Sequence, residues 1–250
     1  MKTRQYLLTV EECKRLIVKA IAADEKIMKA AMEHTLVIIS GTTNGFLAEE
    51  ILKKLGQLKD FDRRQFRRGV NVGPFAKLTT GAYSNTDVVI RKGEWLVGTT
   101  IYDITDELTA DDIIIKGANA LQPDRKVAGV QIGNPKFGTL VPVLTAVVGR
   151  RVRLVIPVGL EKLVCENITD LAKLVNNPDT TGLRLQPVTG DIVTEIEAFA
   201  MLYGAEAHLV AAGGIGGAEG SCSFAVTGED AALDAFAEDL KAFRAAEQEG

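Results

Sequence analysis

Residues 35–45 of the chain read TLVIISGTTNG and join a short apolar run to a polar turn that is bounded by glycines. The run from Thr35 to Ser40 would place apolar side chains on both faces of a strand. This pattern is typical of a strand that is buried on both faces of a parallel sheet. A helical pattern from Phe46 to Leu55 follows the turn. A buried strand, a tight turn and a helix in this order predict an α/β fold.

The same strand pattern recurs along residues 1–180. Further short apolar runs lie at 87–90, 111–116, 127–132 and 151–158, and helical patterns lie at 11–33 and 139–148. Thr9 and Glu12 have the spacing of a capping box at the start of the first helix. We therefore predict a mainly parallel sheet with helices on both faces for residues 1–180.

A different pattern begins after the turn cluster Asn-Asn-Pro-Asp at 176–179. Strands are expected at 183–187, 205–211 and 221–226, and helices at 191–203 and 230–245. This order predicts a small ferredoxin-like α+β domain over residues 181–250. The glycine-rich run 213–217 precedes a strand and not a helix, so we expect a hairpin there instead of a dinucleotide-binding loop.

The composition limits the class of protein. The 250 residues are 46% hydrophobic and 25% charged, with a net charge of -4, so direct binding to nucleic acid is not expected. The three cysteines are far apart and predict no disulfide framework. No apolar run reaches about 18 residues and no apolar signal core follows Met1, so we expect no membrane partner and a cytoplasmic location.

The turn after the first predicted strand is a candidate anion site. Free amides and the helix dipole favour an anion at the start of a helix. Glycine lets the backbone approach a ligand, and the hydroxyl and amide side chains offer further hydrogen bonds. The candidate residues are Ser40, Gly41, Thr42, Thr43 and Asn44. A capped turn without a ligand remains the alternative, because the same residue types cap helices.

Two other predicted strands end in comparable loops. One loop begins with Lys116 and Gly117 and contains Asn119, and the other contains Gly133, Lys136, Gly138 and Thr139. Because parallel strands end at the same edge of a sheet, we expect all three loops to surround one pocket. The second loop lacks the lysine that follows the last glycine of a nucleotide-triphosphate loop, so such a nucleotide is not expected.

The sequence indicates no metal site and no cofactor. His34 lies at the end of the first predicted helix, and His208 has no histidine or cysteine at ligand spacing beside it. No Gly-x-Ser-x-Gly nucleophile motif occurs.

Two of these motifs resemble a known family. The strand that ends in Ser-Gly-Thr-Thr-Asn is similar to the sugar-phosphate loop of ribose-5-phosphate isomerase A. Residues 110–120 resemble the strand of the same family that ends in Asp-Gly-Ala-Asp-Glu. The wider superfamily includes glucosamine-6-phosphate isomerase, coenzyme A transferases and the effector domains of sugar-responsive repressors. The resemblance covers roughly residues 10–160, and it implies an isomerase-like fold that binds a sugar phosphate.

The chain departs from the isomerase motif where the family has acidic residues, because Lys116, Asn119 and Ala120 stand there. Two functions remain open. In an isomerase-like enzyme acting on a small phosphorylated or carboxylated metabolite, Lys116 would neutralise charge, Asn119 would orient the substrate and Glu161 would act as a base. In the alternative, the protein is a metabolite-sensing module without catalysis. The oligomeric state also stays open, with a homo-oligomer among the alternatives.

Overall fold

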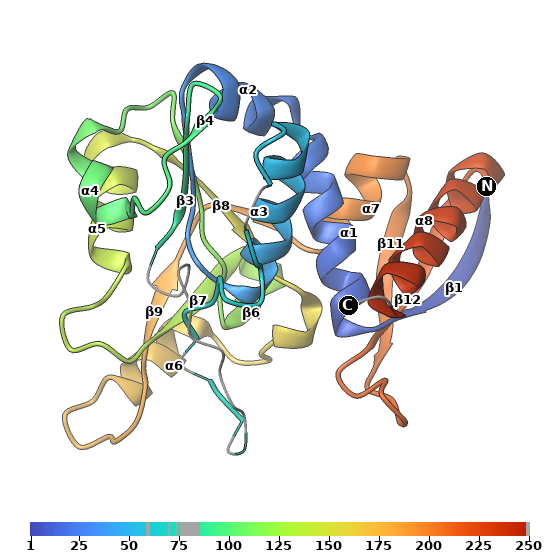
Figure 1. The fold of residues 1–250 in the computed structure, drawn as a ribbon. Helices are drawn as coiled ribbons and strands as arrows, with labels where there is room; N and C mark the ends of the chain where they lie inside the picture. The colour runs from blue at the N-terminus through green and yellow to red at the C-terminus, as the bar shows by residue number, and fades with distance from the viewer. Residues whose placement is uncertain (59–60, 70, 74, 76–85, 249–250) are drawn as a thin grey trace.

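The computed structural model describes residues 1–58, 61–69, 71–73, 75 and 86–248 (Figure 1). These residues form an α/β fold with three sheets. Part of the segment 60–86, for which the sequence predicts long connections with short strands, lies outside the described residues. Within the described parts of the chain, every helix is too short or too polar to cross a lipid bilayer.

The largest sheet is mixed. Its order is β10 (Asp191–Val193), β8 (Arg153–Pro157), β5 (Ile113–Ile115), β2 (Thr35–Ile38), β3 (Val88–Arg91) and β4 (Glu94–Trp95). The first four strands run parallel, β3 pairs antiparallel with β2, and β4 pairs antiparallel with β3. The residues of β2 and β5 are all buried, which agrees with their uninterrupted apolar sequences.

Helices lie on both faces of this sheet. On one face, α1 (Val10–Ala23), α2 (Glu25–Glu33) and α3 (Thr42–Lys54) pack against Leu36 and Ile38. On the other face, α4 (Ile101–Ile104) and α5 (Leu140–Leu144) pack against the alternate residues of the strands, and a π-helical turn, Thr145–Gly149, continues α5.

The first helix begins as predicted but is divided. The Thr9–Glu12 capping box is present, because the amide of Thr9 donates to Glu12 Oε2 (2.8 Å) and the amide of Glu12 donates to Thr9 Oγ1 (3.2 Å). The single helix expected over 11–33 is wrong. Asp24 has an extended backbone, and its carboxylate accepts the amide of Lys26 (2.9 Å), so it ends α1 and caps α2.

A second sheet corrects the expectation for residues 127–132. These residues form β7 (Val127–Ile132), but β7 lies between β6 (Ala120–Gln122) and β9 (Arg184–Val188) in an antiparallel sheet and not in the parallel one. The turn Pro123–Arg125 is short enough to connect β6 and β7 as a hairpin, which a crossover to a parallel neighbour could not do. The helix α6 (Ile168–Val175), which the sequence pattern did not predict, packs on this sheet.

The third sheet contains the first and the last of the strands in the described part of the chain. It consists of β1 (Lys2–Leu8), β12 (Cys222–Gly228) and β11 (Glu206–Ala212), all antiparallel. The predicted glycine-rich hairpin is confirmed, since residues 213–217 lie between β11 and β12. The strands expected at 183–187, 205–211 and 221–226 are present as β9, β11 and β12, but β9 pairs with β7 and β1 lies beside β12. The helix expected over 191–203 begins only at Glu195, because residues 191–193 form β10 and pair with β8.

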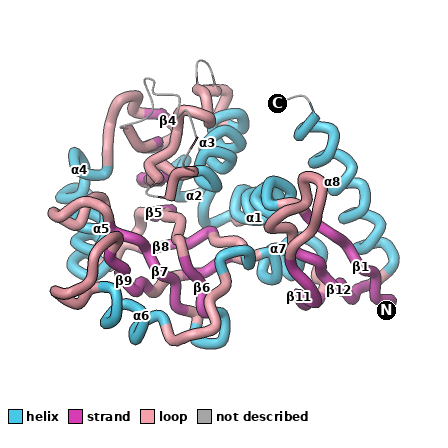
Figure 2. Tube along the Cα trace, turned by 90° about the horizontal axis from the view of Figure 1, so that it is seen from below, coloured by secondary structure: helices cyan, strands magenta, loops and turns pink. Residues whose placement is uncertain are grey.

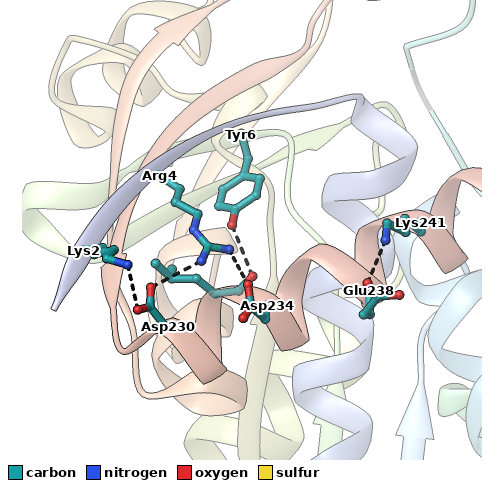
Figure 3. Close-up of polar contacts among 8 residues, drawn as sticks. Lys2, Arg4, Tyr6, Asp230, Asp234, Glu238 and Lys241 are labelled. Atoms are coloured by element: carbon teal, nitrogen blue, oxygen red, sulfur yellow. Dashed lines mark hydrogen bonds and ion pairs between the residues drawn. The ribbon is translucent and has the colours of Figure 1, made fainter.

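Hydrogen bonds and ion pairs connect β1 to α8 (Asp230–Gln248), as Figure 3 shows. Lys2 Nζ donates to Asp230 (2.8 Å), and Arg4 Nη1 donates to Asp234 (2.6 Å). Tyr6 donates its hydroxyl hydrogen to the carbonyl of Leu233 (3.2 Å). The ion pairs are exposed and contribute little, so the buried aromatic and aliphatic side chains between sheet and helix hold this part together.

One hydrophobic core connects the third sheet to the rest of the molecule. Figures 1 and 2 both show α1 and α7 (Glu195–Tyr203) between the largest sheet and the third sheet. Leu16 of α1 and Phe199 of α7 are fully buried, and they belong to the same cluster as Ile114 of β5 and Phe224 of β12. Phe199 also contacts Phe236 of α8 edge-on, with 4.7 Å between the ring centroids.

Candidate functional site

A cavity of about 810 Å³ lies at the carboxyl ends of β2 and β5. Ser40 to Asn44 and Lys116 to Asn119 line it from these two strands, and β7 and the loop after it contribute further lining. Such a volume is in the range of sites for small metabolites. The predicted junctions at Ser40, Lys116 and Gly133 therefore meet at one cavity. Gly133 reaches it from the second sheet, however, and not from the predicted common edge.

The first turn of α3 opens on this cavity. Gly41 is the N-cap residue, no side chain caps the helix, and the first turn contains no acidic residue. The helix begins at Thr42, four residues earlier than predicted, so Thr42, Thr43 and Asn44 are its first helical residues and not a loop. Among the described residues, nothing accepts a hydrogen bond from their amides. This end of α3 can bind an anion.

Two side chains of this turn leave buried oxygens without a partner. Asn44 Nδ2 donates to the carbonyls of Ile39 (2.7 Å) and Ile115 (3.2 Å), so it ties the ends of β2 and β5 together. Both acceptors are carbonyls, which fixes the orientation of the amide and leaves Oδ1 as an unused acceptor. Asn44 Oδ1 and Ser40 Oγ are buried and have no hydrogen-bond partner in the described part of the chain.

Asp87 supports the same turn from the residue that precedes β3. It is 1% exposed, and its carboxylate accepts the amides of Ser40 (3.0 Å) and Ile101 (2.9 Å). Arg68 Nη1 lies 3.3 Å from Asp87 Oδ1. Burial raises the pKa of Asp87, although Arg68 and the two amides oppose that shift. The sequence pattern does not predict a role for Asp87, which stands out only as an acidic residue directly before an apolar run.

Among the described residues, four cationic side chains line the cavity: Arg67, Arg68, Lys116 and Lys162. Arg68 pairs with Asp87, and Lys162 lies 3.8 Å from Glu161. Arg67 and Lys116 are half-buried and have no carboxylate within 4 Å among the described residues. Burial lowers the pKa of Lys116 to about 8, although Asp87 nearby favours the charged form. The arginines were not predicted, since residues 60–86 show no regular pattern.

The loop after β7 brings part of its predicted set to the cavity. Gly133, Gly138 and Thr139 line it, whereas Lys136 is exposed and does not. Asn134 Oδ1 accepts the amide of Lys136 (2.8 Å), and this local turn holds the lysine outside. Lys136, which the sequence predicts as a ligand-binding residue, therefore does not line the cavity.

Asn119 and Glu161 differ from the roles expected of them. Asn119 lines the cavity, but its Oδ1 accepts the amide of Gln131 (3.0 Å) and so holds the β6–β7 hairpin. Glu161 does not line the cavity. It lies beside Glu195 of α7, because a Cβ placed on Gly159 would overlap Glu161 Oε2 and lie 3.0 Å from Glu195 Oε1. Burial, with a contribution from Glu161, raises the pKa of Glu195 to about 7.

Among the described residues, no group of three or more histidine, cysteine, aspartate or glutamate side chains is placed to hold a metal ion. Gly117, another predicted residue, lines the cavity and leaves open space beside Lys116, since a Cβ there would approach only the carbonyl of Pro157, at 3.9 Å.

Comparison with known proteins does not assign the chain to a family. No family model, no curated protein and no solved structure matches this chain.

Proposed function

We propose that the cavity binds a small anionic metabolite, phosphorylated or carboxylated. The observation that carries this proposal is the excess of positive charge there. Arg67 and Lys116 are half-buried without a carboxylate partner in the described part of the chain, and both face the same cavity as the free amides of α3. Half-buried unpaired cations are costly, and an anion that accepts their hydrogen bonds would offset that cost.

The ligand class follows from the kinds of donor. The α3 amides and the guanidinium of Arg67 suit the several oxygens of a phosphate or a carboxylate. The partially exposed ring of Phe137 and the side chain of Val130 give the cavity an apolar wall, which suits the carbon skeleton of a metabolite. The resemblance of Ser40–Asn44 to a sugar-phosphate loop favours a phosphorylated sugar within this class.

Whether the site also catalyses a reaction separates the two functions left open by the sequence. No aspartate or glutamate lines the cavity among the described residues, and Glu161 lies outside it. Proton transfer between sugar carbons needs a base at the substrate. This arrangement supports binding, as in a metabolite-sensing module, over isomerisation by a carboxylate.

The experiment is a thermal-shift screen of the purified chain with inorganic phosphate, sugar phosphates, small carboxylates and the matching neutral sugars. At a hundredfold excess over Kd, a ligand adds about 2.7 kcal/mol to the free energy of unfolding. We expect stabilisation by one or more anions and none by the neutral sugars. Each stabilising compound is then incubated with the protein and followed by NMR, where turnover would favour the enzyme. A screen in which no anion raises the melting temperature would contradict the proposal.

A further inference from the structure

Lys116 occupies a distinctive place in the cavity. It follows the last residue of β5, and its amide donates to the carbonyl of Val155 (3.0 Å), so its backbone is fixed between β5 and β8. The carbonyl of the preceding Ile115 accepts the amide of Ile39 (2.9 Å) and Asn44 Nδ2 (3.2 Å). These bonds hold the start of Lys116 directly beside the first turn of α3.

The surroundings of Lys116 leave its amine available. Arg68, and not Lys116, pairs with Asp87, and Lys116 has no carboxylate within 4 Å in the described part of the chain. Gly117, the next residue, carries no side chain that could shield the amine from a ligand. A half-buried amine without an ion pair, beside an anion-binding helix end, can react as a nucleophile when it loses its proton.

We propose that Lys116 forms an imine with the carbonyl carbon of a phosphorylated aldehyde or ketone held in the cavity. This inference rests on the proposed function, which supplies the anion site. The neutral Nζ attacks the carbonyl carbon, and the carbonyl oxygen leaves as water after two protons have moved to it from the nitrogen. One C=N bond replaces the C=O bond, and no oxidant or reductant is needed. The phosphate meanwhile lies at the amides of Thr42 and Thr43.

The protonation state of Lys116 agrees with this chemistry. Burial and the charge of Arg68 lower its pKa, Asp87 raises it, and the resulting pKa is about 8. At pH 7.5 roughly a quarter of such an amine is neutral, against roughly 0.1% for a lysine at the ordinary value of about 10.4. When the imine is protonated, it restores the positive charge beside Asp87 and the bound anion.

The other lysines in the described part of the chain lack this combination of features. Lys162 also lines the cavity, but it lies 3.8 Å from Glu161. Burial lowers the pKa of Lys14, with a contribution from the charge of Lys162, yet Lys14 does not line the cavity. Lys136 lies in a neighbouring loop and is exposed, so it is a suitable internal control.

The test uses pyridoxal 5′-phosphate, an aldehyde that carries a phosphate, as the probe. The full chain is incubated with the probe between pH 6 and pH 10, reduced with borohydride, digested and mapped by mass spectrometry. We expect Lys116 to be labelled at least tenfold faster than Lys136 at pH 7.5, with a rate that levels off above about pH 8. Inorganic phosphate should slow the labelling of Lys116 and not that of Lys136, and unphosphorylated pyridoxal should label Lys116 more slowly.

Two variants complete the experiment. Lys116→Arg keeps the positive charge but cannot form the imine, so it should lose the label at 116, while Lys136→Arg should retain it. Circular dichroism verifies that both variants fold.

Two results would overturn the inference, and they differ in what they mean for the proposed function. If Lys116 is labelled no faster than Lys136 while inorganic phosphate still raises the melting temperature, the imine is rejected and anion binding stands. If phosphate neither raises the melting temperature nor slows the labelling, the anion site is rejected and the phosphorylated substrate with it.

Discussion

Replacing Glu195 by glutamine should make the stability of the protein much less dependent on pH. Glu195 is fully buried, and its Oε2 accepts the amide of Leu160 (3.0 Å), while Oε1 has no hydrogen-bond partner among the described residues. Glu161 and the thiol of Cys13 are the titratable groups beside it. Burial raises its pKa from 4.5 to about 7, because the charged form loses its hydration there.

The sign follows from the protons that each state binds. Between pH 4.5 and pH 7 the folded protein holds a proton on Glu195 that the unfolded chain has released, so the free energy of unfolding falls as the pH rises. The contribution of the protonated Glu195 to the free energy of unfolding is fully present below pH 4.5 and is lost as the pH rises through 7. A shift from 4.5 to about 7 corresponds to a loss on the order of 3 kcal/mol in total.

Glutamine keeps the acceptor for Leu160 and cannot ionise. We therefore expect the free energy of unfolding of Glu195→Gln, relative to the parent protein, to increase by about 2 to 3 kcal/mol between pH 5 and pH 8. Urea unfolding at pH 5, 6.5 and 8, followed by circular dichroism, measures this difference. Glu166→Gln is the matched control, because Glu166 is exposed. A difference between Glu195→Gln and the parent protein that stays constant across this pH range would refute the reasoning.

Three further predictions concern the cavity and the core. Lys116→Ala should weaken binding of an anionic ligand about ten- to a hundredfold in calorimetry, the worth of one charge-assisted hydrogen bond, whereas Lys136→Ala should not change it. Asp87→Ala leaves the amides of Ser40 and Ile101 without their acceptor, so it should lower the free energy of unfolding by about 2 to 4 kcal/mol in urea. Phe236→Ala should cost about 3 to 5 kcal/mol by the same measurement, because this ring is 1% exposed and packs against three aromatic side chains. Equal binding by Lys116→Ala, or unfolding curves of the other two that match the parent protein, would contradict them.

The sequence was informative wherever the local pattern and the burial agree. The apolar runs at β2, β5 and β8 are buried on both faces, so their composition alone predicts their place in the centre of a sheet. The residues of a strand do not determine which other strand pairs with it. For that reason the sequence predicts β7 in the parallel sheet, whereas it lies in the antiparallel one. The sequence does not predict β1, because its partner β12 lies at the other end of the sequence.

The candidate site was predictable to a similar degree. Ser40 to Asn44 and Lys116 directly follow recognisable strands, and the position of a strand end in a parallel sheet places them together. Arg67 and Arg68 lie in a segment without a regular pattern, so only the folded chain shows that they line the same cavity. Glu161 also follows a strand end, but the side on which its carboxylate is buried depends on Gly159 and on Glu195 of α7.

The pairing of β1 with β12 has a consequence for how the protein folds during synthesis. Thr3 Oγ1 and Thr227 Oγ1 lie 2.8 Å apart although 224 positions of sequence separate them. At the usual elongation rate the ribosome needs about 10 to 45 s to add that many residues. During that time β1 has been synthesised but β12, the strand with which it pairs, has not. Meanwhile β2 and β5 can already pair. The complete third sheet can therefore form only after β12 has been synthesised, and we expect contacts between residues so distant in sequence to slow that step.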